Sequence, residues 1–309
     1  MRQAIEAAER IVLITHINPD ADSMGSACAM YAYLLRLQKK ITLFCATQTI
    51  DARLECIPWS EKTTSRYDGR ADLAIAFDCA SYARLGVSPG CTLINVDHHA
   101  TNEGYGDIRM VDPGAASTTM VLLRWLEEEG IRINPKMATA LYAGLADDTV
   151  AFMSRRTDAA VFEAAAKLLR AGADVHAVHR SLFVRQPLSA LRLKGLIFET
   201  MQLHLDGRVV VLRVSREMLK RSGAQPEDCE SALHEAMGLP TVRVALLFRE
   251  REDGSIRGSL RTDDGIDVSR IAAQFSGGGH PFAAGFIVEG ESMATLETKV
   301  LKAIEKELE

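Results

Sequence analysis

The chain has 309 residues, with 36 Lys and Arg against 41 Asp and Glu and a formal net charge of −5. Hydrophobic residues make up 47% and charged residues 25% of it, which is ordinary for a soluble globular protein and excludes intrinsic disorder, collagen and coiled coil. The acidic balance disfavours binding to long duplex nucleic acid, which rewards clustered Lys and Arg. The length predicts two domains.

The sequence predicts neither a membrane protein nor a secreted one. No apolar run approaches the roughly 18 residues that span a bilayer. The N-terminus has acidic residues before a short apolar run, unlike a signal peptide. The six cysteines form no CxxC pair, so we interpret them as reduced, mostly buried residues. These features predict a cytoplasmic protein that does not bind membranes.

The first part of the chain alternates predicted strands and helices. Continuous apolar runs suit strands that are buried on both faces of a parallel sheet, and such runs occupy residues 11–14, 41–45, 73–77 and 92–96. Helical spacing marks residues 2–9, a segment from residue 23, and residues 117–129, 135–145 and 158–171. We therefore expect an α/β domain over residues 1–184, with an open, mostly parallel sheet and helices on both faces.

The pattern changes after this domain. Residues 189–203 are helix-like, and we assign 185–203 to a connecting segment. A smaller α+β domain is expected over 204–309. Its predicted strands are 209–214, 242–248 and 255–260, its helices 227–237 and 294–306, and its glycine-rich loop 277–280.

Acidic and histidine residues gather in four predicted loops of the first domain. Three of them follow predicted strands, and the fourth, Asp147-Asp148-Thr149, follows an apolar stretch. The three strand-end groups are His16 to Asp22 (with Asp20), Asp78, and Asp97-His98-His99. Because ligands of open α/β sheets bind outside the carboxyl ends of the strands, we expect these groups to converge.

Such a cluster predicts a metal centre. Unpaired carboxylates in one crevice repel each other and are costly to desolvate, and divalent cations resolve that conflict. Mixed carboxylate and imidazole ligands suit Mn²⁺, with Mg²⁺ as the alternative. A lone strand-end Asp is more often a helix cap and a lone His more often a hydrogen-bonding group, but their combination favours two metals that act on a phosphorus centre.

The second domain offers candidate anion-binding groups. Glycines allow backbone N–H groups to approach an anion closely, and an Arg side chain matches phosphate with two parallel hydrogen bonds. The residues concerned are Gly278, Gly279 and His280 in the predicted loop and Arg261 on a predicted strand. By itself the triple glycine is more often a flexible turn.

At these residues the sequence resembles the DHH phosphoesterase superfamily, and specifically its subfamily with a DHHA1 domain. HINPDADSMGSA, FDCA, VDHHATN and GLADDTVAF resemble its first four motifs, and IDVSRIAAQFSGGGHPFAAGF resembles the DHHA1 signature. Length and domain order are similar to the bacterial NrnA-like group of nanoRNases and 3′-phosphoadenosine-5′-phosphate (pAp) phosphatases. The resemblance covers nearly the whole chain and implies an active-site cleft between the two domains.

The resemblance also implies roles for individual residues. The implied metal ligands are His16, Asp20, Asp22, Asp78, His98 and Asp148, with Asp78 bridging the two ions. Asp147 competes with Asp148 for this role, and the Thr149 match favours Asp148. His99 is implied to contact the scissile phosphate, and Asp97 to orient an imidazole. Arg261, Gly278, Gly279 and His280 are implied to bind substrate.

The chain departs from the family pattern at two positions. Val150 follows Thr149 where Gly is usual, and Met120 stands where many relatives have an acidic residue. We expect both to affect substrate preference more than metal binding.

The resemblance implies a two-metal phosphoesterase that hydrolyses short oligonucleotides (nanoRNA) to mononucleotides, or pAp to AMP, or both. The alternatives are a phosphodiesterase for pApA or cyclic dinucleotides, and a non-catalytic nucleotide sensor. The expected partners are short RNA or DNA oligonucleotides or nucleoside bisphosphates, without long duplexes, and a homodimer is plausible for this kind of protein.

Overall fold

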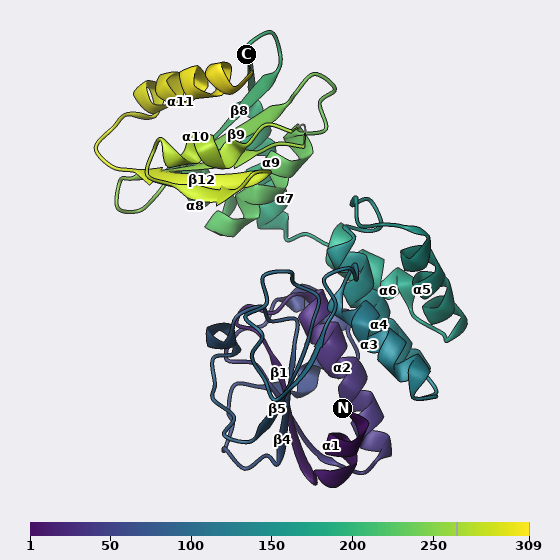
Figure 1. Ribbon diagram of the computed structural model, residues 1–309. Helices are drawn as coiled ribbons and strands as arrows, with labels where there is room; N and C mark the ends of the chain where they lie inside the picture. The colour runs from purple at the N-terminus through teal and green to yellow at the C-terminus, as the bar shows by residue number, and fades with distance from the viewer. Residues whose placement is uncertain (264, 309) are drawn as a thin grey trace. The chain divides into compact units, whose positions relative to one another are not determined.

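The computed structural model describes residues 1–263 and 265–308, which form two compact units. The first unit comprises Met1–Arg185 and the second Gln186–Glu309 (Figure 1). In the part of the chain described, no helix combines the length and the apolar character needed to cross a bilayer.

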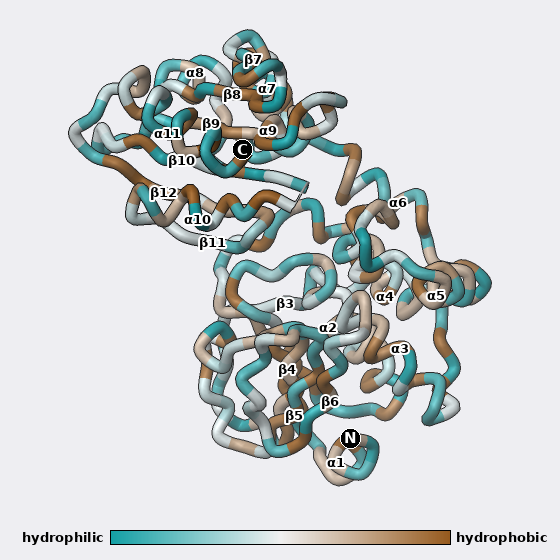
Figure 2. Tube along the Cα trace, turned by 45° about the horizontal axis from the view of Figure 1, so that its top comes forward, coloured by the Kyte–Doolittle hydropathy of each residue, from teal (hydrophilic) through white to brown (hydrophobic). Residues whose placement is uncertain are grey.

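The first unit is built on a six-stranded parallel sheet. The strands lie in the order β3-β2-β1-β4-β5-β6, and every neighbouring pair is parallel. Their bounds are β1 Arg10–Thr15, β2 Lys40–Phe44, β3 Thr63–Thr64, β4 Leu73–Phe77, β5 Thr92–Asp97 and β6 Ile108–Val111. All residues of β4 are buried, as its continuous apolar run predicts, and Figure 2 shows hydrophobic colour along β4 and β5.

The helices of this unit share one apolar cluster with one face of the sheet. Their bounds are α1 Arg2–Ala7, α2 Ala21–Arg36, α3 Thr118–Glu128, α4 Pro135–Asp148, α5 Ala159–Arg170 and α6 Val175–His179, followed by the π-helical turn η4 Arg180–Val184. α2 packs so closely on α4 that a Cβ on Gly25 would lie 2.3 Å from the carbonyl oxygen of Ala140. These two helices, which lie side by side in Figure 1, carry Asp22 and Asp148.

The second face of the sheet is covered differently from the expectation of helices on both faces. Val12, Ile14 and Ala76 pack there against residues of the loops around 67–71 and 79–91. The 14 residues between β4 and β5 include Pro89 and two glycines, and they form only the 3₁₀-helix η3 (Tyr82–Leu85). A connection this short and rich in helix breakers makes a covering loop instead of a crossover helix.

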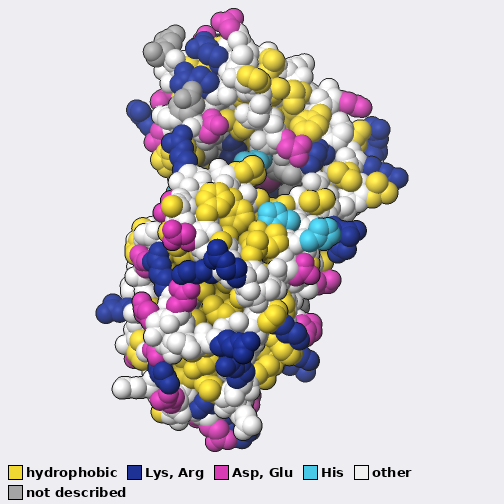
Figure 3. Space-filling view, turned by 90° about the vertical axis from the view of Figure 1, so that its right-hand side faces the viewer, with side chains coloured by type: hydrophobic (Ala, Val, Ile, Leu, Met, Phe, Trp, Pro, Cys, Tyr) yellow, Lys and Arg dark blue, Asp and Glu magenta, His cyan; other side chains and the backbone are white. Residues whose placement is uncertain are grey.

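Aromatic rings tie the turn after α4 to α5 and α6. Phe152 stacks on Phe162 of α5 with 5.7 Å between ring centroids, and the Tyr142 hydroxyl lies 2.8 Å from Nε2 of His179. Figure 3 shows apolar and histidine side chains gathered on the face of the molecule that carries these helices. This packing anchors the segment that directly follows Asp148.

The second unit has a mixed six-stranded sheet in the order β11-β12-β10-β9-β8-β7, in which β8 and β9 are parallel and the other pairs antiparallel. The strands are β7 Gln202–His204, β8 Val209–Val214, β9 Val244–Glu250, β10 Ile256–Arg261, β11 Gly278–His280 and β12 Ala283–Val288. The helices are α7 Leu188–Glu199, α8 Arg216–Ser222, η5 Pro226–Cys229, α9 Glu230–Ala236, α10 Val268–Ala273 and α11 Met293–Leu308. The expected class of both units, α/β followed by α+β, is confirmed.

Two local expectations for the second unit differ from the structure. Residues 278–280, expected as a loop, pair with β12 as strand β11. Helix α7 lies within the segment 185–203 that we assigned to a connection, and its Leu193 and Ile197 are buried in the core of the second unit against β8 and α9. Both differences arise from tertiary contacts that local sequence does not encode.

Candidate metal centre

The polar residues of the first unit converge at the carboxyl edge of its sheet. His16 directly follows β1, Asp78 directly follows β4, and Asp97 is the last residue of β5. β1 and β4 are neighbouring strands. The chain continues from β1 to β2, toward one edge of the sheet, and from β4 to β5, toward the other edge. Such a switch point is where open α/β sheets bind ligands.

Asp78 lies between the two buried histidines. Its Oδ2 is 3.7 Å from Nε2 of His16, and its Oδ1 is 3.5 Å from Nε2 of His98. Asp78 is 2% exposed, and its backbone is in the left-handed region with φ 56°. One carboxylate is thus within reach of two separate ligand groups.

Each histidine faces a further carboxylate from a helix end. Nε2 of His16 lies 3.4 Å from Asp20, and Nε2 of His98 lies 3.0 Å from Asp148. Asp20 also caps α2, because its Oδ1 accepts the N–H of Ser23. The groups whose ligand atoms lie close enough for one ion are His16/Asp20/Asp78, Asp22/His98/Asp148 and Asp78/His98/His99.

Asp22 is fully buried and is held by the first turn of α3. Its Oδ2 accepts the N–H of Thr118 at 2.6 Å, and its Oδ1 accepts the N–H of Thr119 at 2.8 Å. These backbone donors orient the carboxylate, while burial and the nearby charges of Asp78 and Asp148 raise its pKa well above the ordinary value.

Asp97 organises the loop that follows β5. Its Oδ1 accepts the backbone N–H groups of His98 and His99, and it lies 2.7 Å from Nδ1 of His99. Asn102 donates to its other oxygen. Burial raises the pKa of Asp97, but these hydrogen bonds outweigh burial and lower it overall. Asp97 therefore stays ionised and directs Nε2 of His99, whose side chain is 37% exposed, away from itself.

The electrostatics of the cluster fit a divalent cation. Burial raises the pKa of Asp78 as well as that of Asp22. Burial alone lowers the pKa of His16, but the carboxylates of Asp20 and Asp78 outweigh it and raise the pKa to about 10. The cluster thus has an excess of carboxylates that attracts positive charge, and its imidazole and carboxylate donors suit divalent metals such as Mn²⁺.

The fourth predicted loop is in fact the end of a helix. Asp147 and Asp148 are the last two residues of α4. Asp148 faces His98, whereas Oδ2 of Asp147 accepts the N–H of Ala21 at the start of α2. Burial raises the pKa of Asp147 to about 6. Consecutive residues on a helix point about 100° apart, which separates these two carboxylates.

The departures at Val150 and Met120 take different local forms. Val150 has φ 51°, the left-handed region that a β-branched residue rarely adopts, and Ala151 and Phe152 share it. Met120 is 6% exposed in the first turn of α3. Val150 therefore strains the backbone two residues after Asp148.

Arg261 of the second unit is paired within its own unit. It lies in β10, and its Nη2 donates to Glu230 of α9 at 2.8 Å. The hydroxyl of Ser259 donates to the other oxygen of Glu230. The side chains of Arg261 and Glu230 are each about one-third exposed, so the pair is accessible from solvent.

The glycines of strand β11 differ in what a side chain would meet. A Cβ on Gly279, which has φ 147°, would lie 2.5 Å from the carbonyl oxygen of Ala283, so pairing with β12 requires glycine there. A Cβ on Gly278 would meet no atom within 4 Å. Gly278 and His280 are exposed. The close approach at Gly279 thus serves the strand pair, and Gly278 is open.

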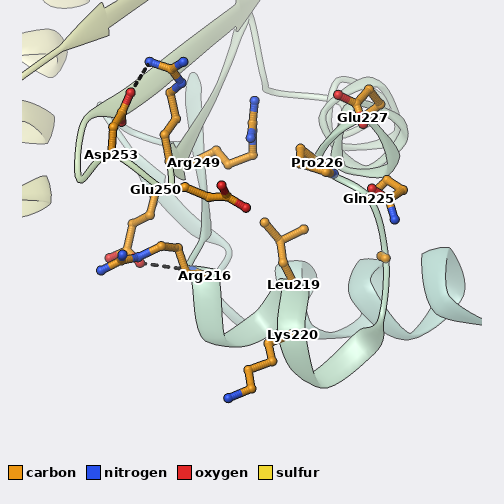
Figure 4. Close-up of a pocket in the computed structure, with 12 residues that line it drawn as sticks. Arg216, Leu219, Lys220, Gln225, Pro226, Glu227, Arg249, Glu250 and Asp253 are labelled. Atoms are coloured by element: carbon orange, nitrogen blue, oxygen red, sulfur yellow. Dashed lines mark hydrogen bonds and ion pairs between the residues drawn. The ribbon is translucent and has the colours of Figure 1, made fainter.

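A hollow elsewhere on the second unit contains none of the predicted site residues. It lies between α8, η5 and the turn from β9 to β10 (Figure 4). Charged side chains of both signs line it, and Arg251 pairs with Asp253 at 3.0 Å. The hollow therefore offers no support for the predicted substrate-binding residues.

Sequence reasoning missed three residues that contact the cluster. Thr118 donates its hydroxyl to Oδ1 of Asp78 at 2.8 Å, in addition to its backbone bond with Asp22. Arg84 lies beside His16, and Arg156 lies beside His98. Ser117, which caps α3, marked the helix start that presents Thr118. The two arginines had no local signal, because only the tertiary fold brings them to the histidines.

Comparison with known families identifies the class of protein. The DHH family, N-terminal domain, matches residues 10–145, and the DHHA1 domain matches residues 206–309. The chain belongs to the DHH/DHHA1 phosphoesterases, a family of hydrolases.

Curated relatives align with nearly the whole chain. One is "Bifunctional oligoribonuclease and PAP phosphatase NrnA" of Thermus thermophilus, 29% identical over 301 residues, with 96% of this chain and 90% of the relative covered. The Bacillus subtilis protein of the same name is 27% identical over 290 residues and covers 92% and 90%. The chain is thus similar to full-length bacterial NrnA proteins.

Solved structures share the fold. An exopolyphosphatase-related protein from Bacteroides fragilis has a TM-score of 0.88 at 24% identity, covering 99% of this chain and 94% of that one. Exonuclease RecJ bound to manganese has a TM-score of 0.53 at 17% identity, covering 98% and 92%. Proteins that are described by different activities therefore share the fold of this chain.

Proposed function

We propose that this phosphoesterase uses two divalent metal ions, with Mn²⁺ as the first choice and Mg²⁺ as the alternative, to hydrolyse short phosphorylated nucleotides. Its proposed substrates are nanoRNA, which it degrades to mononucleotides, and pAp, which it converts to AMP. The names of the NrnA relatives, which combine an oligoribonuclease with a PAP phosphatase, support this pair of substrates.

The position of Asp78 between His16 and His98 carries the proposal. The separations of 3.7 and 3.5 Å suit a carboxylate that bridges two ions. His16 and Asp20 would complete one ligand set, and Asp22, His98 and Asp148 the other. Bound ions would activate a water and neutralise the charge that develops on phosphoryl oxygens.

His99 is the proposed contact to the scissile phosphate. Asp97 holds its Nδ1 at 2.7 Å, so its Nε2 points to a different partner. An imidazole fixed in this way can donate to a phosphoryl oxygen as negative charge accumulates there. Arg261, Gly278, Gly279 and His280 are the proposed groups for the remainder of the nucleotide.

Two other functions give different results in the same assay. A pApA or cyclic-dinucleotide phosphodiesterase would turn over those dinucleotides faster than pAp. A non-catalytic nucleotide sensor would bind nucleotides without hydrolysing them, but the full set of candidate ligands in the first unit favours an enzyme.

The decisive experiment offers the purified full chain, loaded with Mn²⁺ or Mg²⁺, a panel of substrates. The panel contains pAp, pApA, a cyclic dinucleotide, short RNA, a long single-stranded RNA and pyrophosphate. We expect turnover of pAp and short RNA. Comparable turnover of the long RNA would overturn the preference for short substrates, and no turnover of any nucleotide would overturn the proposed activity.

Asp78→Asn tests the bridging role, because an amide cannot bridge two cations with two charged oxygens. We expect hydrolysis of every substrate to be lost. The matched control is Asp68→Asn, since Asp68 has a 69% exposed side chain away from the cluster. Retained activity in Asp78→Asn would reject the bridging role.

A further inference from the structure

Two arginines approach the two buried histidines at the same ring atom. Nη2 of Arg84 lies 2.9 Å from Nδ1 of His16, and Nη1 of Arg156 lies 3.1 Å from Nδ1 of His98. Both arginines are exposed residues, whereas the histidine side chains are 3% exposed. Arg84 belongs to η3 after β4, and Arg156 to the segment after α4, so the two guanidiniums come from separate parts of the chain.

Each of these Nδ1 atoms also faces a backbone carbonyl. The oxygen of Ile17 lies 2.9 Å from Nδ1 of His16, and the oxygen of Ala115 lies 3.2 Å from Nδ1 of His98. An imidazole nitrogen either carries a proton and donates or presents a lone pair and accepts. Because guanidinium only donates and a carbonyl only accepts, each Nδ1 can serve one of these two partners at a time.

A bound ion would fix this choice in favour of the carbonyl. The Nε2 atoms face the carboxylates, since that of His16 is 3.4 Å from Asp20 and that of His98 is 3.0 Å from Asp148. An ion held among those groups would take the Nε2 lone pair. The ring proton would then reside on Nδ1 and be donated to the carbonyl, as ligating histidines commonly do. Neither arginine would then have an acceptor on the histidine ring beside it.

We propose that Arg84 and Arg156 bind oxygens of the substrate phosphate once the two histidines hold metal ions. This inference deepens the proposed function and rests on it. A guanidinium matches phosphate with two parallel N–H bonds, and both arginines stand exposed beside a buried cluster where an anionic substrate would arrive. Arg84 contacts His16 and Arg156 contacts His98, so each arginine can engage the substrate beside a different histidine.

The test separates phosphate binding from metal binding in Arg84→Ala and Arg156→Ala. Calorimetry on the full chain measures the Kd for Mn²⁺ alone, and then the Kd for inorganic phosphate on the Mn²⁺-loaded protein. We expect the Mn²⁺ Kd to stay within about threefold or to tighten, because a competitor for Nδ1 is removed. We expect the phosphate Kd to weaken about tenfold in each variant, since a charge-assisted hydrogen bond is lost.

Matched variants guard against a trivial loss of structure. The backbone carbonyl of Arg84 accepts the N–H of Ile17 at 2.8 Å, and Arg84→Ala retains that bond. Arg84→Lys and Arg156→Lys keep the charge and should recover part of the phosphate affinity. Arg70→Ala removes an arginine with a 73% exposed side chain and should change neither constant.

Two results would overturn the inference. The first is a phosphate Kd on the loaded protein that is unchanged in both alanine variants, even if the enzyme hydrolyses pAp. The second is a weakened Mn²⁺ Kd with unchanged phosphate binding, which would make the arginines positioning residues for the histidine rings. Arginine-dependent phosphate binding supports the inference even where no nucleotide is turned over, so its outcome is distinct from that of the proposed activity.

Discussion

Gly144 of α4 lies directly against Asp22 of α2. A Cβ on Gly144 would stand 2.5 Å from Oδ1 of Asp22 and 2.7 Å from its Cα. Gly144→Ala should therefore push Asp22 away from the amides of α3 and destabilise the protein by about 1–3 kcal/mol, the usual cost of overpacking. Thermal unfolding and a Mn²⁺ titration measure both effects, and we expect weaker metal binding.

The control for this variant is Gly195→Ala in α7, where a Cβ meets no atom within 4 Å. Alanine there should stabilise the helix by about 0.5–1 kcal/mol. Equal Tm values and Mn²⁺ affinities for wild type and Gly144→Ala would contradict the close approach.

Thr118→Val removes the hydroxyl that donates to Asp78 but keeps the shape of the side chain and the backbone bond to Asp22. Loss of such a supporting bond typically costs about 10–100-fold in metal affinity. We expect that loss in a Mn²⁺ titration. Thr118→Ser keeps the hydroxyl and should bind Mn²⁺ like wild type; a Ser variant as weak as the Val variant would assign the effect to packing.

Val150→Gly should stabilise the protein. Val150 has φ 51°, and a left-handed backbone costs an L-residue with a Cβ roughly 1–2 kcal/mol. After the greater chain entropy of glycine is subtracted, we expect a gain of about 1 kcal/mol and a Tm increase of about 2–4 °C. Val150→Ala retains the Cβ and should give no comparable increase, so equal gains in both variants would exclude backbone strain as the cause.

Asp147→Asn and Asp148→Asn should separate two neighbouring carboxylates. Asp148 faces His98, whereas Asp147 accepts the N–H of Ala21, a bond that an amide oxygen can also accept. Loss of a bond that only supports a ligand costs about 10–100-fold in metal affinity, and we expect Asp148→Asn to lose more Mn²⁺ affinity than that. We expect Asp147→Asn to bind Mn²⁺ like wild type. The reverse order would exchange the two roles.

The pH dependence of the metal-free protein should report on Asp147. Burial raises its pKa from 3.8 to about 6, so the folded state binds this proton more tightly than the unfolded chain. The stability that the protonated group contributes is present below about pH 4 and is lost as pH rises through about 6. The Tm of Asp147→Asn should fall less steeply with pH across this range than the Tm of the wild type. Identical slopes in the two proteins would refute the raised pKa.

The strand-end residues could be predicted from sequence because buried parallel strands are continuous apolar runs, and the ends of those runs mark where a ligand site lies. His16, Asp78 and Asp97 follow from that rule alone. Asp148 was predicted as a site residue but in a loop, because the predicted helix ended at residue 145, whereas α4 continues to Asp148.

The remaining features depend on contacts between distant segments. Thr118, Arg84 and Arg156 carry no motif, and only the folded chain brings them to Asp78, His16 and His98. Strand β11 was predicted as a loop because consecutive glycines resemble a turn, but pairing with β12 overrides that preference. The expectation of helices on both faces of the sheet did not account for the loop at 79–91, which covers the second face.

The candidate ligands are spread from His16 to Asp148 and lie in or directly beside five separate strands and helices. A chain emerging from the ribosome cannot assemble them until α4 has been synthesised and has docked on α2. Ion capture by the group that includes Asp148 would therefore follow the docking of α4, whereas the group of His16, Asp20 and Asp78 is complete without that helix.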